Sequence, residues 1–580
     1  NEWAGGHYQV HPLPQSMQQM AWDYGSLNPD HEKEFIQKRL HLLDRSLSHT
    51  EVDTLALLIY SSQQTTREFA REHIASVIAT HAHSRHAVSD EELSARASSA
   101  VSLRDILRVF SLFSYFCRAP EEAAVVFLGS GSSRRANAIV LSVAVVYYLR
   151  LGVDRTTKDD FRQKFRSRLQ GVCGRGGADI EGVLASCMEA LMRQTHLDAG
   201  IASTRGLREN IFMVVVCTLA QIPLMIVGPP GSSKTLAVTV VAENAKGEYS
   251  KSAFYKVAPK LIPSHYQCSR RSTSKQIQEV FERAIERQAK EGCKSQCFVF
   301  MDEAGLPEEE RESLKVLHYY LENHLAVAAR VSFVAISNHA LDAAKSNRCA
   351  LLTRAKPDHQ ELRSVAKGCL GSEEELKTLD SAVATVRHGS PAVLHLDPSG
   401  GGDGLLDILC ETYDACMSER PRQGVGIGHK PPADFASFFG LRDFMHFVKL
   451  LGRLAHNGEG QGQGHARPTI TCEKLVEALQ RNFNGVENKP LRELMDYFME
   501  PFCSLGLPSL QSLRHSPLQL HNPLELMRRS LAEQVRSAAP ISRYMLVVDT
   551  TTDDSILRGL QSLLAADAVA AARARAESGQ

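Results

Sequence analysis

Residues 224–235 read Leu-Met-Ile-Val-Gly-Pro-Pro-Gly-Ser-Ser-Lys-Thr, a short apolar run followed at once by a loop of small residues. The run predicts a buried strand. The loop matches the pattern G-x-x-x-x-G-K-[ST], except that Ser233 stands where the second glycine is usual. Small residues allow backbone N–H groups to close around phosphate oxygens, and the following helix directs its positive end at the anion. The stretch therefore predicts a strand, a phosphate loop and a helix that bind a nucleoside triphosphate.

The residues of this loop have distinct expected roles in binding ATP with Mg²⁺. Lys234 is expected to reach the β and γ phosphates, and the Thr235 hydroxyl is expected to ligate the metal ion. The expected nucleotide contacts are Gly228, Pro229, Pro230, Gly231, Ser232, Ser233, Lys234, Thr235 and Leu236. A Gly/Pro turn with a chance Lys-Thr pair is the weaker alternative, because further motifs follow in order.

A second apolar run ends in two carboxylates. Residues 297–303 read Cys-Phe-Val-Phe-Met-Asp-Glu, which fits a parallel strand that helices cover on both faces. Asp302 is expected to hold Mg²⁺ through water, and Glu303 to polarise the water that attacks the γ phosphate. An Asp-Glu pair is common, and its place at a strand end downstream of Lys234 is what gives it meaning.

A third strand is predicted at residues 331–337, and Asn338 follows it directly. The Asn338 amide is expected to orient the attacking water, although a lone asparagine more often caps a turn. The order of phosphate loop, acidic strand and Asn-tipped strand resembles the core of AAA+ ATPases. This resemblance implies an α/β P-loop NTPase fold, with a parallel sheet flanked by helices and α-helical lid domains.

Three arginines are candidates for contacts with nucleotide. The segment 340–348 resembles the one that carries an arginine finger in AAA+ proteins, a side chain that enters a neighbouring module's site and stabilises transition-state charge. Arg348 is the first candidate and Arg354 the second, and the sequence does not decide between them. Arg442, in Gly-Leu-Arg-Asp at 440–443, resembles the lid arginine that touches bound nucleotide. The alternative is a solvated surface charge for Arg348 and Arg354, and an ordinary ion pair on the helix surface for Arg442.

The lid motif occurs twice, since Ser-Leu-Arg-Asp at 102–105 echoes residues 440–443. Such repetition indicates tandem modules, with the chain as a fragment of a longer polypeptide. The predicted organisation is a helical lid of a preceding module at 1–130, a helical linker at 131–204, the large α/β domain with the ATP site at 205–357, a helical lid with Gly-rich insertions at 358–540, and the start of a degenerate module at 541–580.

The motif series resembles the mysterin-like family of giant, dynein-like AAA+ RING-type E3 ubiquitin ligases. The resemblance rests on several short matches in order, including Val-His-Pro-Leu-Pro-Gln-Ser-Met at 10–17, Gln-Cys-Ser at 267–269, Met-Asp-Glu-Ala-Gly-Leu at 301–306 and Ala-Ile-Ser-Asn-His-Ala-Leu-Asp at 335–342. Ser233 also resembles that family. The resemblance implies an ATPase module whose partners are adjacent AAA+ modules of the same polypeptide and, through the parent protein, the ubiquitin machinery.

Two other functions remain open at this stage. A mechanochemical remodeller of the dynein, midasin or MoxR type would carry the same site residues. A non-hydrolysing ATP switch is also possible, although the intact Asp302-Glu303 pair argues against it. No RING-type zinc spacing is visible among the 13 cysteines, so any ligase activity is expected elsewhere in the parent protein.

Composition narrows the function classes. Lys plus Arg and Asp plus Glu both number 66, so no global basic field indicates nucleic acid. The basic stretch from Lys158 to Arg168 is interpreted as a solvated helix face. Scattered cysteines and no signal peptide predict a cytoplasmic protein. Apolar runs at 136–149 and 211–227 are too short or too interrupted to span a bilayer, so no transmembrane segment is predicted.

Overall fold

The protein is described from a computed structural model, which places residues 15–18, 20, 28–81, 101–130, 134–150, 155–173, 179–198, 200–308, 312–321, 330–339, 341, 343–370, 393–394, 405–418, 439–456, 470–483, 493–498 and 500. These residues divide between two compact units. One contains residues 1–371 and 440–445, and the other contains 372–439 and 446–580. Each unit is described by itself. The predicted module start at 541–580 and most of the Gly-rich insertions lie outside the described residues.

The first unit is built on a five-stranded parallel sheet with the order β2-β3-β4-β1-β5. Its strands are β1 (Leu224–Val227), β2 (Lys260–Gln267), β3 (Ser295–Asp302), β4 (Ser332–Ser337) and β5 (Ala350–Thr353). The three strands predicted from apolar runs are thus present as β1, β3 and β4. Because β4 lies between β1 and β3, its carboxyl end separates the loop after β1 from the carboxylates after β3.

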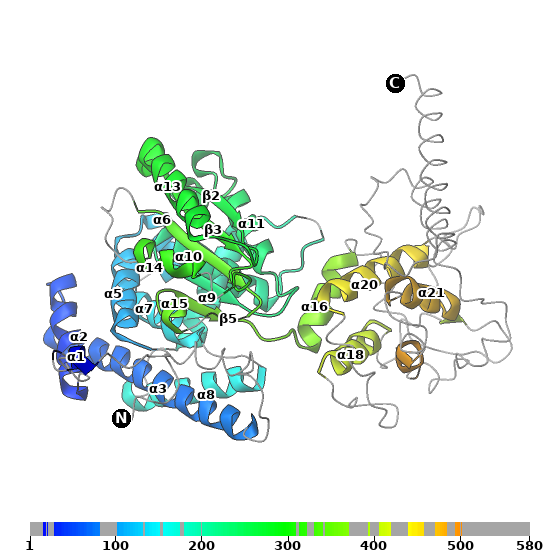
Figure 1. Cartoon of the computed structure of the whole chain (residues 1–580), viewed down its shortest axis with the longest axis horizontal. Coiled ribbons are helices and arrows are strands. Elements are labelled where there is room, and N and C mark those ends of the chain that lie inside the picture. Colours follow the sequence, from blue (N-terminus) through cyan, green and yellow to red (C-terminus); the bar gives the residue numbers. More distant parts are fainter. Residues whose placement is uncertain are drawn as a thin grey trace. The chain divides into compact units, whose positions relative to one another are not determined.

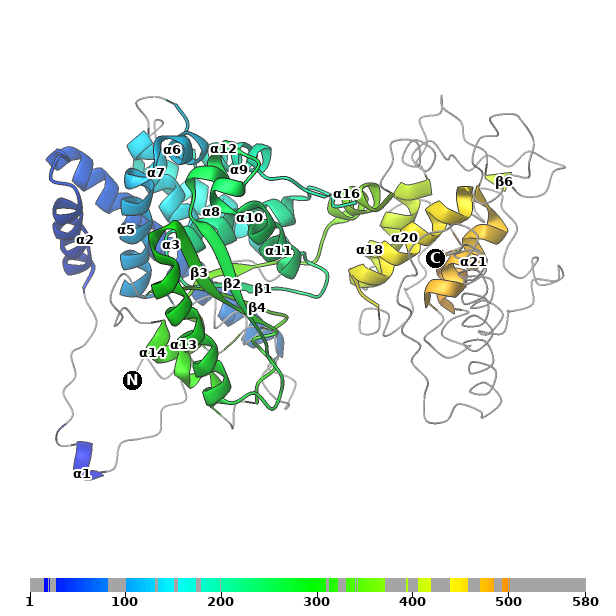
Figure 2. The ribbon, with the colours of Figure 1, turned by 90° about the horizontal axis from the view of Figure 1, so that it is seen from above.

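Helices cover both faces of this sheet (Figures 1 and 2). Side chains alternate along each central strand, so Ile226 and Met225 enter different cores. On one face, β1 and β4 pack against α10 (Arg205–Leu219) and α11 (Lys234–Asn244). On the other face, the strands pack against α13 (Ser274–Glu291) and α14 (Leu317–Tyr320). This three-layer α/β arrangement is the expected AAA+ fold class.

Most helices before residue 205 share the larger core with α10 and the sheet. They are α2 (Pro29–Leu43), α3 (His49–His81), α5 (Leu103–Arg118), α6 (Glu121–Leu128), α7 (Arg134–Val143), η1 (Ala144–Tyr148), α8 (Arg155–Cys173) and α9 (Ile180–Gln194). The short helix α1 (Gln15–Gln18) precedes them, and its Met17 is exposed. The apolar run at 136–149 becomes α7 and the π-helical turn η1, both buried. Among the described helices, none combines the length and apolar character that crossing a bilayer requires.

The interpretation of the basic stretch on α8 as a solvated face is wrong for two of its residues. Lys158 and Arg162 are 7% and 3% exposed, and both are ion-paired with the buried Glu209. Lys164 and Arg168 do lie on the exposed side of the helix. The local sequence did not reveal this burial because the carboxylate that compensates the charges lies on α10.

The first unit also contains η2 (Gly247–Tyr249), α12 (Ala253–Val257), η3 (Gly292–Lys294), η5 (Ser313–Val316) and α15 (Ala343–Ser346), which lie between strands, and α16 (His359–Leu370), which follows β5. The second unit contains α18 (Leu405–Ser418), most of α20 (Leu441–His456), α21 (Cys472–Phe483) and the antiparallel pair β6 (Val393–Leu394) and β7 (Ile470–Thr471). It is thus mainly helical in its described part, and the first turn of α20 belongs to the first unit.

Candidate nucleotide-binding site

The candidate phosphate loop, residues 228–235, connects the buried end of β1 to the start of α11. Gly231 has a φ of 84°, a region that favours glycine, and a Cβ there would lie 2.7 Å from the Cβ of Leu441. Ser233 has a φ of 57° and a ψ of 26°, so it occupies the left-handed conformation that the missing glycine would adopt readily. The loop therefore keeps its expected shape at the position where the sequence departs from the pattern.

Lys234 lies inside this loop and is 7% exposed. Its Nζ donates hydrogen bonds to the carbonyl oxygens of Gly228 at 2.5 Å and Pro229 at 2.9 Å. Burial lowers the pKa of Lys234 to about 8; the nearby Glu303 and Asp302 carboxylates raise it, and Arg442 lowers it further. The ammonium is thus held at the loop with acidic groups close by. Thr235 follows as an exposed residue in the first turn of α11.

Asn338 joins the loop to the acidic strand. Its Oδ1 accepts from Lys234 Nζ at 3.0 Å, and its Nδ2 donates to both carboxylate oxygens of Glu303, at 3.2 and 3.0 Å. The sheet order explains this arrangement, since β4 ends between β1 and β3. The structure therefore brings Lys234, Asn338 and Glu303 into one hydrogen-bonded chain, with Asp302 at the end of β3 beside it.

A supporting residue that the motif search missed lies beneath the loop. Asn210, fully buried on α10, donates from Nδ2 to the Ser232 carbonyl oxygen at 2.9 Å. This hydrogen bond fixes the position of the loop backbone at Ser232. The available signal was the polar pair Glu209-Asn210 within an otherwise apolar buried helix, because buried polar side chains are retained where they make specific bonds.

The two lid motifs form the same local structure. The Gly440 N–H donates to Asp443 Oδ2 at 2.8 Å, and the Ser102 N–H donates to Asp105 Oδ2 at 2.9 Å. Each aspartate thereby caps the first turn of its helix, α20 or α5. The arginine between them is exposed in both, and in the second motif Arg442 lies near enough to Lys234 to depress its pKa. The two segments that are similar in sequence, 102–105 and 440–443, thus also have the same local structure.

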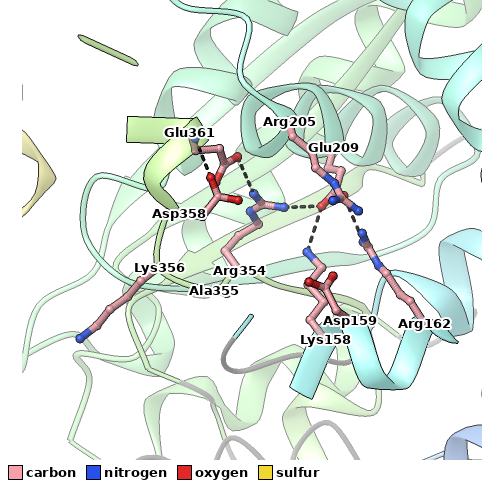
Figure 3. A pocket seen from close by; sticks show the side chains of 10 residues that line it. All are labelled: Lys158, Asp159, Arg162, Arg205, Glu209, Arg354, Ala355, Lys356, Asp358 and Glu361. Atoms are coloured by element: carbon pink, nitrogen blue, oxygen red, sulfur yellow. Dashed lines mark hydrogen bonds and ion pairs between the residues drawn. The ribbon is translucent and has the colours of Figure 1, made fainter. Parts of the chain in front are cut away.

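A cluster of charges lies directly behind the loop (Figure 3). Glu209 accepts from Lys158 at 3.1 Å, Arg162 at 3.0 Å and Arg205 at 3.3 Å, and it is also ion-paired with Arg354. Burial raises the pKa of Glu209, but the four cations outweigh burial and hold the pKa well below its usual value. We call these five residues the Glu209 cluster.

Arg354, the second arginine-finger candidate, is 7% exposed in this cluster. A Cβ on Gly228 would lie 2.5 Å from the Arg354 Cβ, so the two backbones are in close contact. Arg354 Nη2 also lies 3.7 Å from Glu361 Oε1, on the helix that leads away from the sheet. Its guanidinium therefore faces the interior of its own unit.

Arg348, the first candidate, lines a separate groove of about 930 Å³ between α5 and the segment that enters β1. The arginines that line it are Arg39, Arg104, Arg108, Arg118, Arg330 and Arg348. Among the described lining residues there is no aspartate or glutamate. Arg104 belongs to the first lid motif, so the groove combines the first lid arginine with the candidate finger. We call it the arginine groove.

Comparisons with known proteins agree with this architecture. Residues 200–361 match the family model described as the RNF213 AAA domain. A putative uncharacterized transmembrane protein of Dictyostelium discoideum is 26% identical over 96% of this chain and 9% of its own length. E3 ubiquitin-protein ligase rnf213-beta of Danio rerio is 26% identical over 94% of the chain, and E3 ubiquitin-protein ligase RNF213 of Homo sapiens is 26% identical over 93%. The chain spans 9% of the length of each of these relatives.

Among solved structures, that of PCH-2 from C. elegans aligns with 53% of this chain and 70% of its own, at 12% identity and a TM-score of 0.24. At that TM-score the fold assignment rests on the sheet topology and the family match. RNF213 is the protein called mysterin above, so the comparisons confirm the resemblance seen in the motif series. The chain is therefore similar to RNF213 proteins over most of its length, and residues 200–361 match the RNF213 AAA domain.

Proposed function

We propose that the AAA domain binds ATP with Mg²⁺ and hydrolyses it. The observation that carries the proposal is the hydrogen-bonded chain from Lys234 through Asn338 to Glu303. It joins the residue suited to phosphate charge to the residue suited to activating water. A purely structural turn has no need for a buried ammonium and a carboxylate linked through one amide.

The residues fit a triphosphate and its metal ion. Arg354 and Leu441 leave no room for a side chain at Gly228 and Gly231, so the loop presents only backbone at these two positions, and it is backbone N–H groups that bind phosphate oxygens. Thr235 and Asp302 supply the hydroxyl and carboxylate oxygens that Mg²⁺ prefers. When bound, the ion would neutralise charge on the phosphate oxygens.

The proposed chemistry assigns one task to each side chain. Glu303 accepts the proton of the attacking water, and Asn338 holds the carboxylate by both oxygens so that it faces the phosphate loop. Lys234 supplies positive charge to the transferring phosphoryl group. Arg442, at the start of α20, would approach the nucleotide from the lid.

Calorimetry of Mg-ATP binding tests the first half of this proposal. We expect the wild-type chain to bind ATP and Lys234→Ala to lose the binding, while Lys256→Ala, an exposed lysine on α12, binds as wild type does. If wild type does not bind, or if Lys234→Ala binds equally well, the proposed site is wrong.

Glu303→Gln tests the hydrolytic half. This variant retains the size and one acceptor oxygen of the side chain but cannot accept the proton. We expect it to bind Mg-ATP normally and to lower phosphate release by at least about 100-fold, since a general base contributes roughly that much. Unchanged turnover would instead support a non-hydrolysing ATP switch.

A second proposal concerns the arginine groove. We propose that Arg348, with Arg104, stabilises a nucleotide held by a preceding AAA+ module of the same polypeptide. Arg348 is preferred to Arg354 because Arg354 is buried in the Glu209 cluster. By the same geometry, the site of Lys234 needs an arginine from a following module, so this chain alone is expected to hydrolyse ATP slowly.

The test uses the longer polypeptide that carries the preceding module, with Lys234→Ala to silence the site described above. In that background we expect Arg348→Ala to reduce ATP turnover by orders of magnitude, since an arginine finger contributes about 10³-fold or more. Arg193→Ala, an exposed arginine on α9, serves as the control. Equal turnover in both variants would remove Arg348 from the reaction.

At the level of the parent protein, we propose that this module drives conformational change in a giant E3 ubiquitin ligase of the cytoplasm. The proposal rests on the relatives named E3 ubiquitin-protein ligase. It predicts that Glu303→Gln in the full-length protein alters its ubiquitin transfer. Normal transfer with nucleotide turnover abolished would separate the two activities.

A further inference from the structure

We infer that α5 positions the candidate finger, with Asp105 and Arg108 acting through Asn347, the residue before Arg348. This inference rests on the proposed role of Arg348 in the arginine groove. Helix α5 would then have two tasks, because it carries Arg104 and also fixes the position of Arg348. Arg108 and Asp105 are therefore positioning residues.

Asn347 is 5% exposed and is held from α5 at two points. Arg108 Nη2 donates to the Asn347 main-chain oxygen at 2.5 Å. Ser102 Oγ donates to the Asn347 side-chain Oδ1 at 3.1 Å. Main chain and side chain are thus both fixed by residues more than 200 positions earlier in the chain. The backbone that carries Arg348 cannot shift without breaking at least one of these bonds.

We call the bonds by which Arg108 and Ser102 hold Asn347 the clamp, and Asp105 fixes the position of Arg108 within it. The Asp105 Oδ1 accepts from Arg108 Nη1 at 2.6 Å and from Arg150 Nη1 at 2.9 Å, and both Asp105 and Arg150 are fully buried. A buried carboxylate between two guanidiniums is costly to disturb, because removing it leaves two charges without compensation. Arg108 is therefore held in one orientation, with its second terminal nitrogen directed at Asn347.

The far end of the segment is tied to the same carboxylate. Thr353 Oγ1, at the end of β5, donates to the Arg150 carbonyl oxygen at 2.8 Å. Asn347 and Thr353 are thus both linked through an arginine to Asp105, and β5 between them is hydrogen-bonded to β1. Arg348 lies within a segment anchored at both ends, so a movement of α5 would reach it directly.

This arrangement explains why Arg104 on α5 and Arg348, the candidate finger, line one groove although they are far apart in the sequence. Transition-state contacts require placement within a fraction of an ångström, and a misplacement of about 1 Å can cost about 100-fold in rate. The clamp supplies that placement through short, charge-assisted hydrogen bonds, which are stronger than neutral ones.

Two variants weaken the clamp while leaving the groove's charge in place. Arg108→Lys retains the charge, but one ammonium cannot reproduce the planar two-nitrogen contact with Asp105 and Asn347. Ser102→Ala removes the bond to the Asn347 side chain and also the bond by which the Ser102 hydroxyl caps the Arg104 N–H at the start of α5. Ser142→Ala, which removes a buried serine hydroxyl bonded to Ala138 on α7, is the matched control.

The experiment measures turnover by the longer polypeptide with Lys234→Ala. We expect Arg108→Lys to lower kcat about 10-fold or more with KM for ATP within about twofold, and Arg108→Lys combined with Arg348→Ala to be no slower than Arg348→Ala alone. Independent, multiplying effects would show that Arg108 does not act through Arg348. Hydrogen exchange of the Arg348 amide in the present chain gives a second readout, with faster exchange expected in Ser102→Ala than in Ser142→Ala.

The outcomes distinguish the inference from the proposal beneath it. If Arg348→Ala leaves turnover unchanged, the proposed role of Arg348 fails. If Arg348→Ala is slow but Arg108→Lys has normal kcat and Ser102→Ala has normal exchange, the role of Arg348 survives and the clamp is overturned.

Discussion

The Arg354 guanidinium is ion-paired with the Glu209 carboxylate in the interior (Figure 3), and the Arg354 backbone lies against Gly228 at the start of the candidate phosphate loop. Arg354 also approaches Glu361, whose Oε1 accepts from the Gly206 N–H at 2.6 Å. The pair therefore links the loop to α10 and to the helix that leads away from the sheet. This placement makes the Glu209 cluster a determinant of loop geometry.

Replacement of Glu209 by glutamine is expected to destabilise the fold by about 3–5 kcal/mol, because four cations then lose the buried carboxylate that they share. The measurement is the midpoint of urea unfolding at pH 7. Glu189→Gln, in an exposed pair with Arg193, is the control and should cost less than about 1 kcal/mol. Equal effects of the two substitutions would contradict the importance of the cluster.

The difference in stability between wild type and Glu209→Gln is expected to depend on pH. The pKa of Glu209 is held well below its usual 4.5, so its contribution to stability is complete above pH 4.5 and is lost as the pH falls toward the folded-state pKa. The stability difference between wild type and Glu209→Gln should therefore be largest near neutral pH and shrink below about pH 4.5. A difference that grows with acidity would have the wrong sign.

Ser233→Gly is expected to stabilise the protein by about 1 kcal/mol, because Ser233 holds a left-handed φ of 57° that costs a residue with a Cβ. Thermal unfolding measures the change, and Mg-ATP binding should be retained. Ser252→Gly is the control, since Ser252 has an ordinary φ of −97° and glycine there gains nothing. A lower melting temperature for Ser233→Gly would show that the serine makes a compensating contact.

ATP affinity should fall as the pH rises through about 8. Burial lowers the pKa of free Lys234 to about 8, and bound phosphate charge raises it, so the complex retains a proton that the free protein loses. Affinity is then constant below pH 8 and drops by up to about tenfold per pH unit above it. Calorimetry from pH 7 to about 9.5 measures this, and Lys256→Ala should show the same fall as wild type. An affinity that stays constant over this pH range would contradict the prediction.

Gly231→Ala is expected to weaken Mg-ATP binding by about tenfold or more. The new Cβ would adopt a φ of 84° and lie 2.7 Å from the Leu441 Cβ, so the loop or the start of α20 must move. Gly440→Ala is the matched control, because a Cβ at Gly440 meets nothing within 4 Å. Similar affinities for the two variants would mean that the loop tolerates displacement.

The motifs led to the fold class and to much of the candidate site. Residues 224–235, 297–303 and 331–338 carry their information locally, in runs whose apolar character and end residues identify strands that finish at one edge of a parallel sheet. Together with the resemblance to AAA+ ATPases, these runs assigned Lys234, Glu303 and Asn338 to one ATP site, and the structure joins the three by hydrogen bonds. Their catalytic roles remain predictions.

Other relationships were beyond the reach of sequence patterns. The residues around Lys158 in the sequence do not indicate that its charge is buried, because its partner Glu209 lies 51 residues away on another helix. Similarly, no sequence motif predicts the contact between Asn347 and Arg108, which lies 239 residues earlier. Each such contact depends on how helices pack, and packing brings together side chains whose separation along the chain carries no signal.

The sequence by itself determined the phosphate loop and three of the five strands of the AAA domain, because apolar runs and the small residues of a phosphate loop are local properties of the chain. Only the tertiary structure decided which charges are buried and which arginine is presented at a groove. Arg354 and Arg348 are both plausible fingers by sequence, yet one is ion-paired with Glu209 and the other lines the arginine groove. The reason is physical: a buried charge requires a compensating partner, and the fold alone selects that partner.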